Sequence, residues 1–532
     1  MANGVEKIRV PFVSGTISLS EELTVDDLKR ISAPIIEKAM GPIRKALENA
    51  DLSKDDIDLV ILAGGSSQLP GVYNRIYEEL GVEPRKIPKD LMHAISYGAA
   101  LYQKEIFNFP KTKRDVRTLG SSLGIYVDDG GKKGVKLLLN HNKALPATEK
   151  YEFDVSEGQT TVSINLVTMS GNSDRVEKKL RQRNLRLSGS ASKVVVEITV
   201  TENRLIELNA YDPEHTEEKA VIQVDSQMMT KEDIEKKRRE LGIEVVESGN
   251  RLNLEPCIGI DLGTTTSELT YTYRSEDQLN KLKNPDDVKP YDAYCFPSVI
   301  YFDDKADNPE IANKKACIAL DDTSNKEKLC SNFKIADRNR YVVEVDGKGF
   351  RVGDLSALLL HKMWETAMLT FADMNLKSAV ITVPAAFDLD ACQETYNAAI
   401  TAGIETVTLI DEPTSAYQYY SHVQDLSDTN IKNVLVFDFG GGTTDVAILD
   451  VKNDALHESN EYKDCLYKVL GISGEVNCGG KNIDDALVEE IRKRFEEKNK
   501  TKLSPTNLMR LRQAVEGAKV KLSDYYNEMG DE

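Results

Sequence analysis

One strand–turn–strand pattern occurs twice in this chain and constrains the fold more than any other feature. The stretches IDLGTTTSELTY and FDFGGGTTDVAILD each place an aspartate at the end of an apolar strand, then a Gly/Thr turn, then a second strand. Successive backbone N–H groups in such a turn can bind anionic oxygens, and glycine lets the backbone approach a ligand closely. Two related halves of this kind predict a nucleotide held between pseudo-symmetric lobes.

Sequence typical of α/β structure lies on both sides of an all-β segment. Residues 1–111 alternate apolar strands such as DLVILAGG with helices, and residues 257–532 are α/β again. Residues 112–225 form short strands separated by turn signals, which predicts a β sandwich. Residues 226–256 contain a short charged helix and a polar linker. The two α/β segments are therefore either two domains or one domain cut in two.

Composition excludes several classes of partner. The net charge of −19 over 532 residues argues against nucleic acid and against an anionic membrane surface. No stretch reaches the ~18 apolar residues of a membrane span. The seven cysteines contain no CxxC pair, which argues against a disulfide framework or a zinc site. These features favour a cytoplasmic protein.

The turns and their flanking aspartates supply the expected phosphate and metal ligands. The predicted phosphate-binding residues are Gly263, Thr264, Thr265, Gly440, Gly441, Gly442 and Thr443. Asp261, Asp438 and Asp445 offer hard oxygens that can hold a hydrated Mg²⁺. The chain has no GxxxxGK[ST] motif, so this is not a P-loop.

A third glycine-rich element follows a buried strand in VILAGGSSQLPGV. Gly64, Gly65 and Ser66 allow a flat base and a ribose to lie against the backbone before a helix begins. Alone, this element is better explained as an ordinary glycine turn. All three elements in one chain favour a nucleotide site.

Longer blocks of the chain resemble a known family. IGIDLGTTTSE, ITVPAAFD, LIDEPTSAYQYY, VFDFGGGTTDVAIL, LRQAVEGAKVKLS, VILAGGSSQLPGV and SYGAALYQ are similar to blocks of the DnaK-type, 70-kDa heat-shock chaperones. SSLGIYV, LPATEKYEF and VSEGQTTVSI resemble that family's peptide-binding domain. The resemblance implies a two-lobed ATPase domain of the actin-like, ribonuclease-H-like fold. It also implies ATP/ADP and Mg²⁺ as cofactors, and apolar extended peptides, co-chaperones and nucleotide-exchange factors as partners.

The order of these blocks is rotated relative to the family. There the IDLGTT block opens the chain and the peptide domain follows the LAGGS block, whereas here the ATPase blocks begin at Cys257 and resume at Met1. We therefore expect a circular permutation in which residues 226–256 bridge the former ends. VKLSDYYNE and VEKIRVPF are expected to be two arms of one β-hairpin cut at its tip, where permutation is best tolerated.

The resemblance also assigns roles to single residues. It implies catalytic roles for Lys334, Glu412, Asp438, Asp445 and Thr443. It implies nucleotide contacts for Gly479, Glu516, Lys519 and Ser523, and a peptide cleft lined by Ile125, Val127, Val162 and Ile164. The plainer alternatives are a surface lysine at 334, a surface ion pair between Glu516 and Lys519, and ordinary sandwich core for the four apolar residues.

Several positions depart from the family pattern. Val520 and Gln68 stand where two arginines usually flank adenine. Ala386 replaces a tyrosine and Cys392 a coupling arginine, and the linker DVRTLGSS has one leucine instead of a run. Asp128 stands where an apolar residue often arches over the peptide, and only a short helix remains of the lid.

Two functions from different classes follow. The first is an ATP-hydrolysing chaperone that binds extended apolar segments in its β domain. The alternative is a nucleotide-dependent scaffold or sensor that binds one dedicated partner, favoured by the altered linker, Asp128 and the missing lid. A small-molecule kinase uses the same ATPase fold but ranks last, because a β sandwich offers no acceptor pocket with a base.

Overall fold

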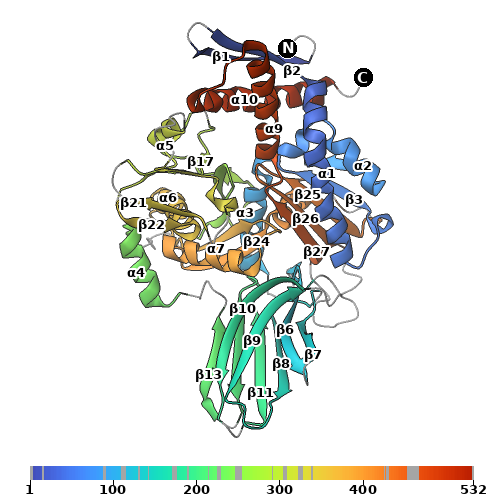
Figure 1. The fold of residues 1–532 in the computed structure, drawn as a ribbon, viewed down its shortest axis with the longest axis vertical. Helices are drawn as coiled ribbons and strands as arrows, with labels where there is room; N and C mark the ends of the chain where they lie inside the picture. Colours follow the sequence, from blue (N-terminus) through green and yellow to red (C-terminus); the bar gives the residue numbers. More distant parts are fainter. Residues whose placement is uncertain are drawn as a thin grey trace.

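The structure is a computed structural model, which describes residues 4–14, 17–87, 91–109, 115–129, 132–141, 143–169, 176–188, 191–213, 215–223, 229–245, 255–289, 291–303, 308–320, 327–336, 340–424, 426, 430–451 and 466–529. It contains two α/β lobes and a separate pair of β-sheets below them (Figure 1). Within the described part, no helix is long and apolar enough to cross a membrane.

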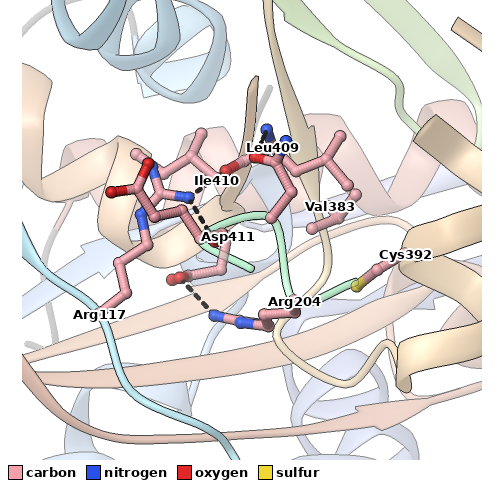
Figure 2. Close-up of a pocket in the computed structure, with 9 residues that line it drawn as sticks. Arg117, Arg204, Val383, Cys392, Leu409, Ile410 and Asp411 are labelled. Carbon is pink, nitrogen blue, oxygen red and sulfur yellow. Dashed lines mark hydrogen bonds and ion pairs between the residues drawn. The ribbon is translucent and has the colours of Figure 1, made fainter. Parts of the chain in front are cut away.

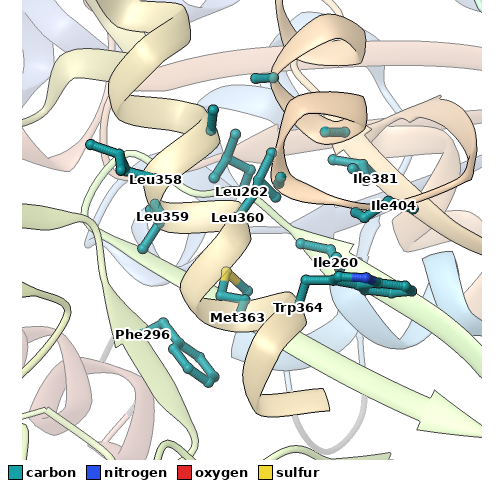
Figure 3. Packing of buried hydrophobic residues seen from close by; sticks show 14 of the residues in the cluster. Ile260, Leu262, Phe296, Leu358, Leu359, Leu360, Met363, Trp364, Ile381 and Ile404 are labelled. Carbon is teal, nitrogen blue, oxygen red and sulfur yellow. The ribbon is translucent and has the colours of Figure 1, made fainter. Parts of the chain in front are cut away.

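The first lobe is built on a mixed six-stranded sheet from the C-terminal half of the chain. Its strands run in the order β16-β15-β14-β23-β24, and β17 also pairs with β15. The bounds are β14 (Cys257–Asp261), β15 (Thr266–Thr272), β16 (Asn280–Lys281), β17 (Cys295–Pro297), β23 (Ser378–Val383) and β24 (Thr406–Asp411). Helices α6 (Val352–Thr370) and α7 (Leu389–Ala402) pack on this sheet, and Ile260 and Leu262 meet Met363 and Trp364 in the core (Figure 3).

Smaller elements surround the first lobe. They are β18 (Val299–Tyr301), β19 (Glu310–Ile311), β20 (Leu329–Ser331), β21 (Val342–Val345), β22 (Lys348–Arg351), α5 (Lys314–Ala319) and the 3₁₀ turn η6 (Phe333–Ile335). The last of these matters most, because it carries Lys334 toward the centre of the molecule.

The second lobe combines strands from both ends of the chain. Its sheet has the order β4-β3-β25-β26-β27-β5. The bounds are β3 (Leu59–Ala63), β4 (Pro84–Lys86), β5 (Asp115–Val116), β25 (Asn433–Phe439), β26 (Thr443–Asp450) and β27 (Tyr467–Val476). Leu62 on β3 lies beside Phe437 on β25 in parallel register. The N-terminal and C-terminal α/β segments therefore form one sheet, as expected of one domain cut in two.

Two helices cross between the lobes. α3 (Ala94–Asn108) follows the second sheet but packs on β14, while α8 (Glu412–Val423) leads from β24 to β25. They approach so closely that any side chain at Gly98 would overlap the carbonyl of Ser415. The Ser415 hydroxyl donates to the Ile95 carbonyl at 2.7 Å. This contact holds α3 against α8.

The end of the chain corrects one expectation. VKLSDYYNE is not a hairpin strand, because it lies within helix α10 (Pro505–Met529). Leu511, Val515 and Leu522 are buried at helical spacing, so one apolar face continues through the stretch. The hairpin is formed instead by β1 (Val5–Ser14) and β2 (Ile17–Thr24).

The remaining helices of the second lobe follow the sequence prediction. They are α1 (Val25–Asn49), α2 (Val72–Leu80) and α9 (Gly480–Asn499), with 3₁₀ turns η1 (Lys54–Asp56), η2 (Gly65–Gln68) and η3 (Leu91–His93). Thr24 caps α1, since its hydroxyl accepts from the Asp27 N–H at 3.0 Å. The two chain ends lie close together, because a side chain at Gly4 would approach the Tyr525 ring to 3.0 Å.

Residues 122–223 form the β sandwich. One sheet has the order β10-β9-β6-β7 and the other β13-β12-β11-β8. The bounds are β6 (Ser122–Asp129), β7 (Lys132–Leu139), β8 (Ala147–Asp154), β9 (Thr161–Met169), β10 (Val176–Arg186), β11 (Lys193–Val200), β12 (Ile206–Asp212) and β13 (His215–Gln223). The four residues of the expected peptide cleft lie on β6 and β9. Ile125 and Ile164 are buried in the sandwich core, and Val127 and Val162 are partly buried against it.

The segments that flank the sandwich both pack on the lobes. β5 extends the second sheet in parallel with β27. On the other side, helix α4 (Lys231–Leu241) lies against α7, where Arg238 donates to the carbonyls of Ile400 and Thr401 at 2.8 and 3.1 Å. The short helix that replaces the lid is therefore attached to the first lobe. The side chain of Asp128 and residues 246–254 lie outside the described part.

Candidate nucleotide site

The two Gly/Thr turns meet at the centre of the molecule. Each joins two antiparallel strands, β14 to β15 in the first lobe and β25 to β26 in the second. A side chain at Gly441 would approach the Thr265 hydroxyl to 3.2 Å, and one at Gly442 would approach the Thr264 hydroxyl to 3.0 Å. Glycine at these positions therefore allows the tips of the two hairpins to face each other.

A lysine lies among carboxylates from both lobes. Lys334 Nζ contacts Glu412 Oε1 at 2.5 Å, and both side chains are more than nine-tenths buried. Asp438 and Asp445 lie opposite each other on the second hairpin and are also buried. Asp261 ends β14, where the Thr382 hydroxyl donates to its Oδ1 at 2.8 Å. The predicted catalytic residues are thus brought into one cluster.

The cluster has more carboxyl groups than cations. Burial raises the pKa of Glu412 to about 8, against the opposing effect of Lys334. Burial also raises the pKa of Asp445 to about 6, although the Ala386 N–H donates to its Oδ1 at 2.9 Å. Burial and neighbouring carboxylates raise the pKa of Asp438 well above its ordinary value, and burial raises that of Asp261. One lysine does not balance four buried carboxyl groups.

The donor set fits a hydrated divalent cation. Asp438 Oδ1 and Asp445 Oδ2 are buried without a hydrogen-bond partner. Unsatisfied carboxylate oxygens of this kind suit Mg²⁺, which keeps several waters and takes only one or two carboxylates. Among the described residues, no three His, Cys, Asp or Glu side chains are close enough to form an all-protein metal site. Asp261 and Asp438 would hold Mg²⁺ largely through its waters.

The third glycine element packs on the second turn. The Ser66 hydroxyl donates to the Gly440 carbonyl at 2.8 Å. Gly64 has φ of +74°, and a side chain there would overlap the Asp438 carboxylate. Glycine at 64 is therefore required both by its backbone conformation and by the close approach of the turn.

The start of helix α9 covers the same turn. The N–H groups of Gly480 and Lys481 donate to the carbonyls of Gly440 and Gly441 at 3.1 and 2.8 Å. Gly479 lies so close to the backbone of Gly441 that an added Cβ would come within 2.7 Å of it. These contacts fix the second turn against the start of α9.

The predicted ribose and adenine residues lie on α10. Lys519 Nζ pairs with Asp484 Oδ1 of α9 at 2.8 Å, and the Ser523 hydroxyl donates to the Lys519 carbonyl at 2.9 Å. Glu516 and Val520 are exposed. Asn527 Nδ2 donates to the Gln68 carbonyl at 2.9 Å, which joins α10 to η2. The ion pair of Lys519 is therefore with Asp484 and not with Glu516.

Sequence analysis missed three groups that hold the cluster in place. They are the Thr382 hydroxyl, the Ala386 N–H and Asp411, which precedes Glu412 and accepts from the Thr414 N–H at 3.1 Å. The signal for Thr382 is its position, because β23 runs parallel to β14 and sets Thr382 beside Asp261. Asp411 has the Asp-x-x-Thr spacing of a helix N-cap in DEPT.

Comparisons with known proteins agree with this geometry. A family model described as Hsp70 protein matches residues 4–251 and 257–529. The chaperone protein dnaK of Guillardia theta is 30% identical over 292 residues. That match covers 50% of this chain and 42% of the relative, so the chain spans less than half of that relative's length.

The excess of buried carboxyl groups predicts a pH dependence of stability. Without nucleotide, Glu412 and Asp445 keep protons in the folded protein that the unfolded chain has released, because their pKa values rise to about 8 and about 6. The folded state then binds more protons, so the free energy of unfolding falls as pH rises from about 5 to about 8. Denaturant unfolding at several pH values measures this.

Two controls accompany that measurement. Glu412→Gln carries no titrating group at this position and should make the fall smaller, with the remainder due to the three aspartates. Adding Mg²⁺ with ADP should also reduce it, because a bound cation compensates the ionised carboxylates. Stability of the wild type that stays constant or rises between pH 5 and 8 would contradict the electrostatic description of the cluster.

Proposed function

The chain belongs to the Hsp70 family, and we propose from the geometry of its cleft that it hydrolyses ATP to ADP and phosphate. The observation that carries the proposal is the buried pair of Lys334 and Glu412 beside the facing Gly/Thr turns. Phosphoryl transfer depends mostly on positioning and charge stabilisation, and this cluster supplies both. Water attacks the γ-phosphate in line with the departing ADP.

Each part of the cleft has a role in this mechanism. Backbone N–H groups and hydroxyls of the two turns bind the phosphates. Lys334 supplies the positive charge beside the γ-phosphate, and Glu412 orients the attacking water. Asp261 and Asp438 would hold a hydrated Mg²⁺, which would offset charge on the phosphates when bound, and Asp445 and Thr443 would order water on the other side. The backbone of Gly64 and Gly65 supports the nucleoside.

We further propose that the β sandwich binds extended apolar segments of other proteins, as expected of a chaperone. The similarity of its strands to the family model supports this function. The alternative, a scaffold or sensor for one partner, is supported by α4, which lies on the first lobe. Binding to many unrelated unfolded peptides would favour the chaperone, and binding to one specific partner the scaffold. Co-chaperones and nucleotide-exchange factors would be further partners, acting on the nucleotide cleft between the two lobes.

We propose in addition that the chain is a circular permutation of the family's usual order. Three observations support it. β3 of the N-terminal segment pairs with β25 of the C-terminal segment. Gly4 and Tyr525 bring the two chain ends together. The family model matches two stretches that meet in the linker before β14. In this description residues 226–256, which include α4, join ends that are separate in the family.

The hydrolytic role of Lys334 can be tested by single-turnover hydrolysis of ATP with Mg²⁺. Lys334→Ala should lower the rate constant by about 100-fold, because a buried charge next to the γ-phosphate is lost. Lys519→Ala is the matched control, since it should weaken nucleotide affinity more than the rate constant. Acceleration by an apolar peptide would establish a coupled chaperone, and indifference to peptide would favour the scaffold. No hydrolysis by the wild type would contradict the proposed activity.

The base site can be tested by restoring an arginine. Val520 is half exposed on α10, so a longer side chain there has room. Val520→Arg should tighten ADP binding by about 0.5–2 kcal/mol, because a guanidinium can stack on adenine. Val520→Gln is the control for length without charge or stacking. Calorimetric titration with ADP and Mg²⁺ checks this, and equal affinities of all three proteins would place the base elsewhere.

The permutation can be tested by reversing it. A chain that starts at residue 255, joins residue 529 to residue 4 by a short Gly/Ser linker and ends at residue 245 should fold. Its melting temperature and hydrolysis rate should match those of the original chain, because no described contact is cut. A second permutant opened inside the buried strand β23 should fail to fold. Failure of the first permutant as well would contradict the proposed chain order.

A further inference from the structure

A loop of the β sandwich reaches the end of strand β24, one residue before Glu412. The loop, residues 201–205, joins β11 to β12. Asn203 Nδ2 donates to the Val407 carbonyl at 3.1 Å and its Oδ1 accepts from the Leu409 N–H at 2.9 Å. Arg204 Nη2 donates to Asp411 Oδ2 at 2.9 Å (Figure 2). The sandwich therefore contacts β24 through two side chains with different targets.

The ion pair between Arg204 and Asp411 is buried, and both carboxylate oxygens of Asp411 accept hydrogen bonds. The side chains of Arg204 and Asp411 are 9% and 2% exposed. One carboxylate oxygen of Asp411 meets Arg204, and the other accepts from the N–H and hydroxyl of Thr414 in the first turn of α8. Asp411 thus links the sandwich to the helix turn that begins with Glu412.

The backbone conformation of Arg204 also indicates a functional role. Its φ of +59° lies in the left-handed region, which a residue with a side chain rarely adopts. Such strain persists only where surrounding contacts hold it, and it is common at functional sites. Glycine or asparagine would fit the turn with less strain, so the turn alone does not account for arginine at 204.

Asp411 also lies beside the cluster, because it directly precedes Glu412 in the chain. Its ion-pair partner at this position is Arg204. Without Arg204, the buried Asp411 carboxylate would lose its ion-pair partner, and Arg117, which lines the same pocket, would be the remaining arginine there.

We infer that Arg204 of the β sandwich is a positioning residue of the hydrolytic site. It holds and neutralises Asp411, Asp411 fixes the first turn of α8, and that turn sets the carboxylate of Glu412 against Lys334. The sandwich then contributes a residue to the site that hydrolyses ATP. Its loop acts on Asp411 through the positive charge of Arg204, and not only by packing against β24. The inference rests on the proposed role of Glu412.

The competing explanation is that the loop only attaches the sandwich to the lobe. A variant at Asn203 distinguishes the two explanations. Asn203 lies in the same loop and hydrogen-bonds to the same strand, but its hydrogen bonds are to Val407 and Leu409 and not to Asp411. Asn203→Ala weakens attachment alone, and Arg204→Gln removes the cation. The double variant Arg204→Gln/Asp411→Asn removes both charges and keeps a side chain that caps helices well.

The experiment measures single-turnover hydrolysis and ADP affinity for the full chain and these three variants. Arg204→Gln should lower the rate constant about tenfold or more, because small displacements of a catalytic group are costly, and should leave ADP affinity nearly unchanged. The double variant should recover most of the rate, and Asn203→Ala should stay near the wild type. Equal rates for Arg204→Gln and the wild type, or an equal fall in Asn203→Ala, would overturn the inference.

A second readout separates this inference from the proposed function. If the wild type does not hydrolyse ATP, the proposed function fails, and hydrogen exchange of the amides in residues 412–416 still tests the link. Faster exchange there in Arg204→Gln than in the wild type, Asn203→Ala and the double variant would support it. Unchanged exchange in Arg204→Gln would overturn it, whatever the activity.

Discussion

The buried contact between Lys334 and Glu412 is the interaction on which the rest of the cleft depends. The positive charge of Lys334 acts on Asp261 of the first lobe and on Asp438 and Asp445 of the second lobe. Like charges at this depth repel strongly, so the two lobes gain from a further cation between their turns. A nucleotide with Mg²⁺ would supply that cation and bind both hairpins at once. The repulsion among these carboxyl groups would therefore be offset in part by a bound Mg²⁺.

The cluster forms wherever the two hairpins and Lys334 come together in space, whatever the order of their segments along the chain. The second sheet takes β3 and β4 from one end of the sequence and β25 to β27 from the other. This chain order has a consequence for the β sandwich, because the chain enters the sandwich from one lobe and leaves it toward the other. β5 adds to the second sheet, and α4 packs on α7 of the first lobe. To leave its place, the sandwich would have to break contacts with both lobes.

Features set by local sequence could be predicted, and features set by distant contacts could not. A glycine-rich turn between apolar runs specifies a hairpin by itself, so both Gly/Thr turns follow from the sequence. The hairpin expected of VKLSDYYNE was wrong because Leu522 continues a helical face begun far upstream. The link between Arg204 and Asp411 had no local signal, since the two residues meet only when sandwich and lobe are packed. Burial of Ile125 in the sandwich core likewise depends on the opposite sheet.

The departures from the family pattern lie close to the contacts that the sequence did not reveal. Cys392, which stands where the family has an arginine, lines the same small pocket as Arg204 and Arg117 (Figure 2). Ala386 lacks the family's aromatic ring, yet its N–H still holds Asp445. The positive charge at this junction thus comes from the sandwich and its linker instead of from helix α7. Loss of an arginine from one side of an interface does not break electrostatic linkage when the other side supplies one, because the buried Asp411 requires a cation whichever element carries it.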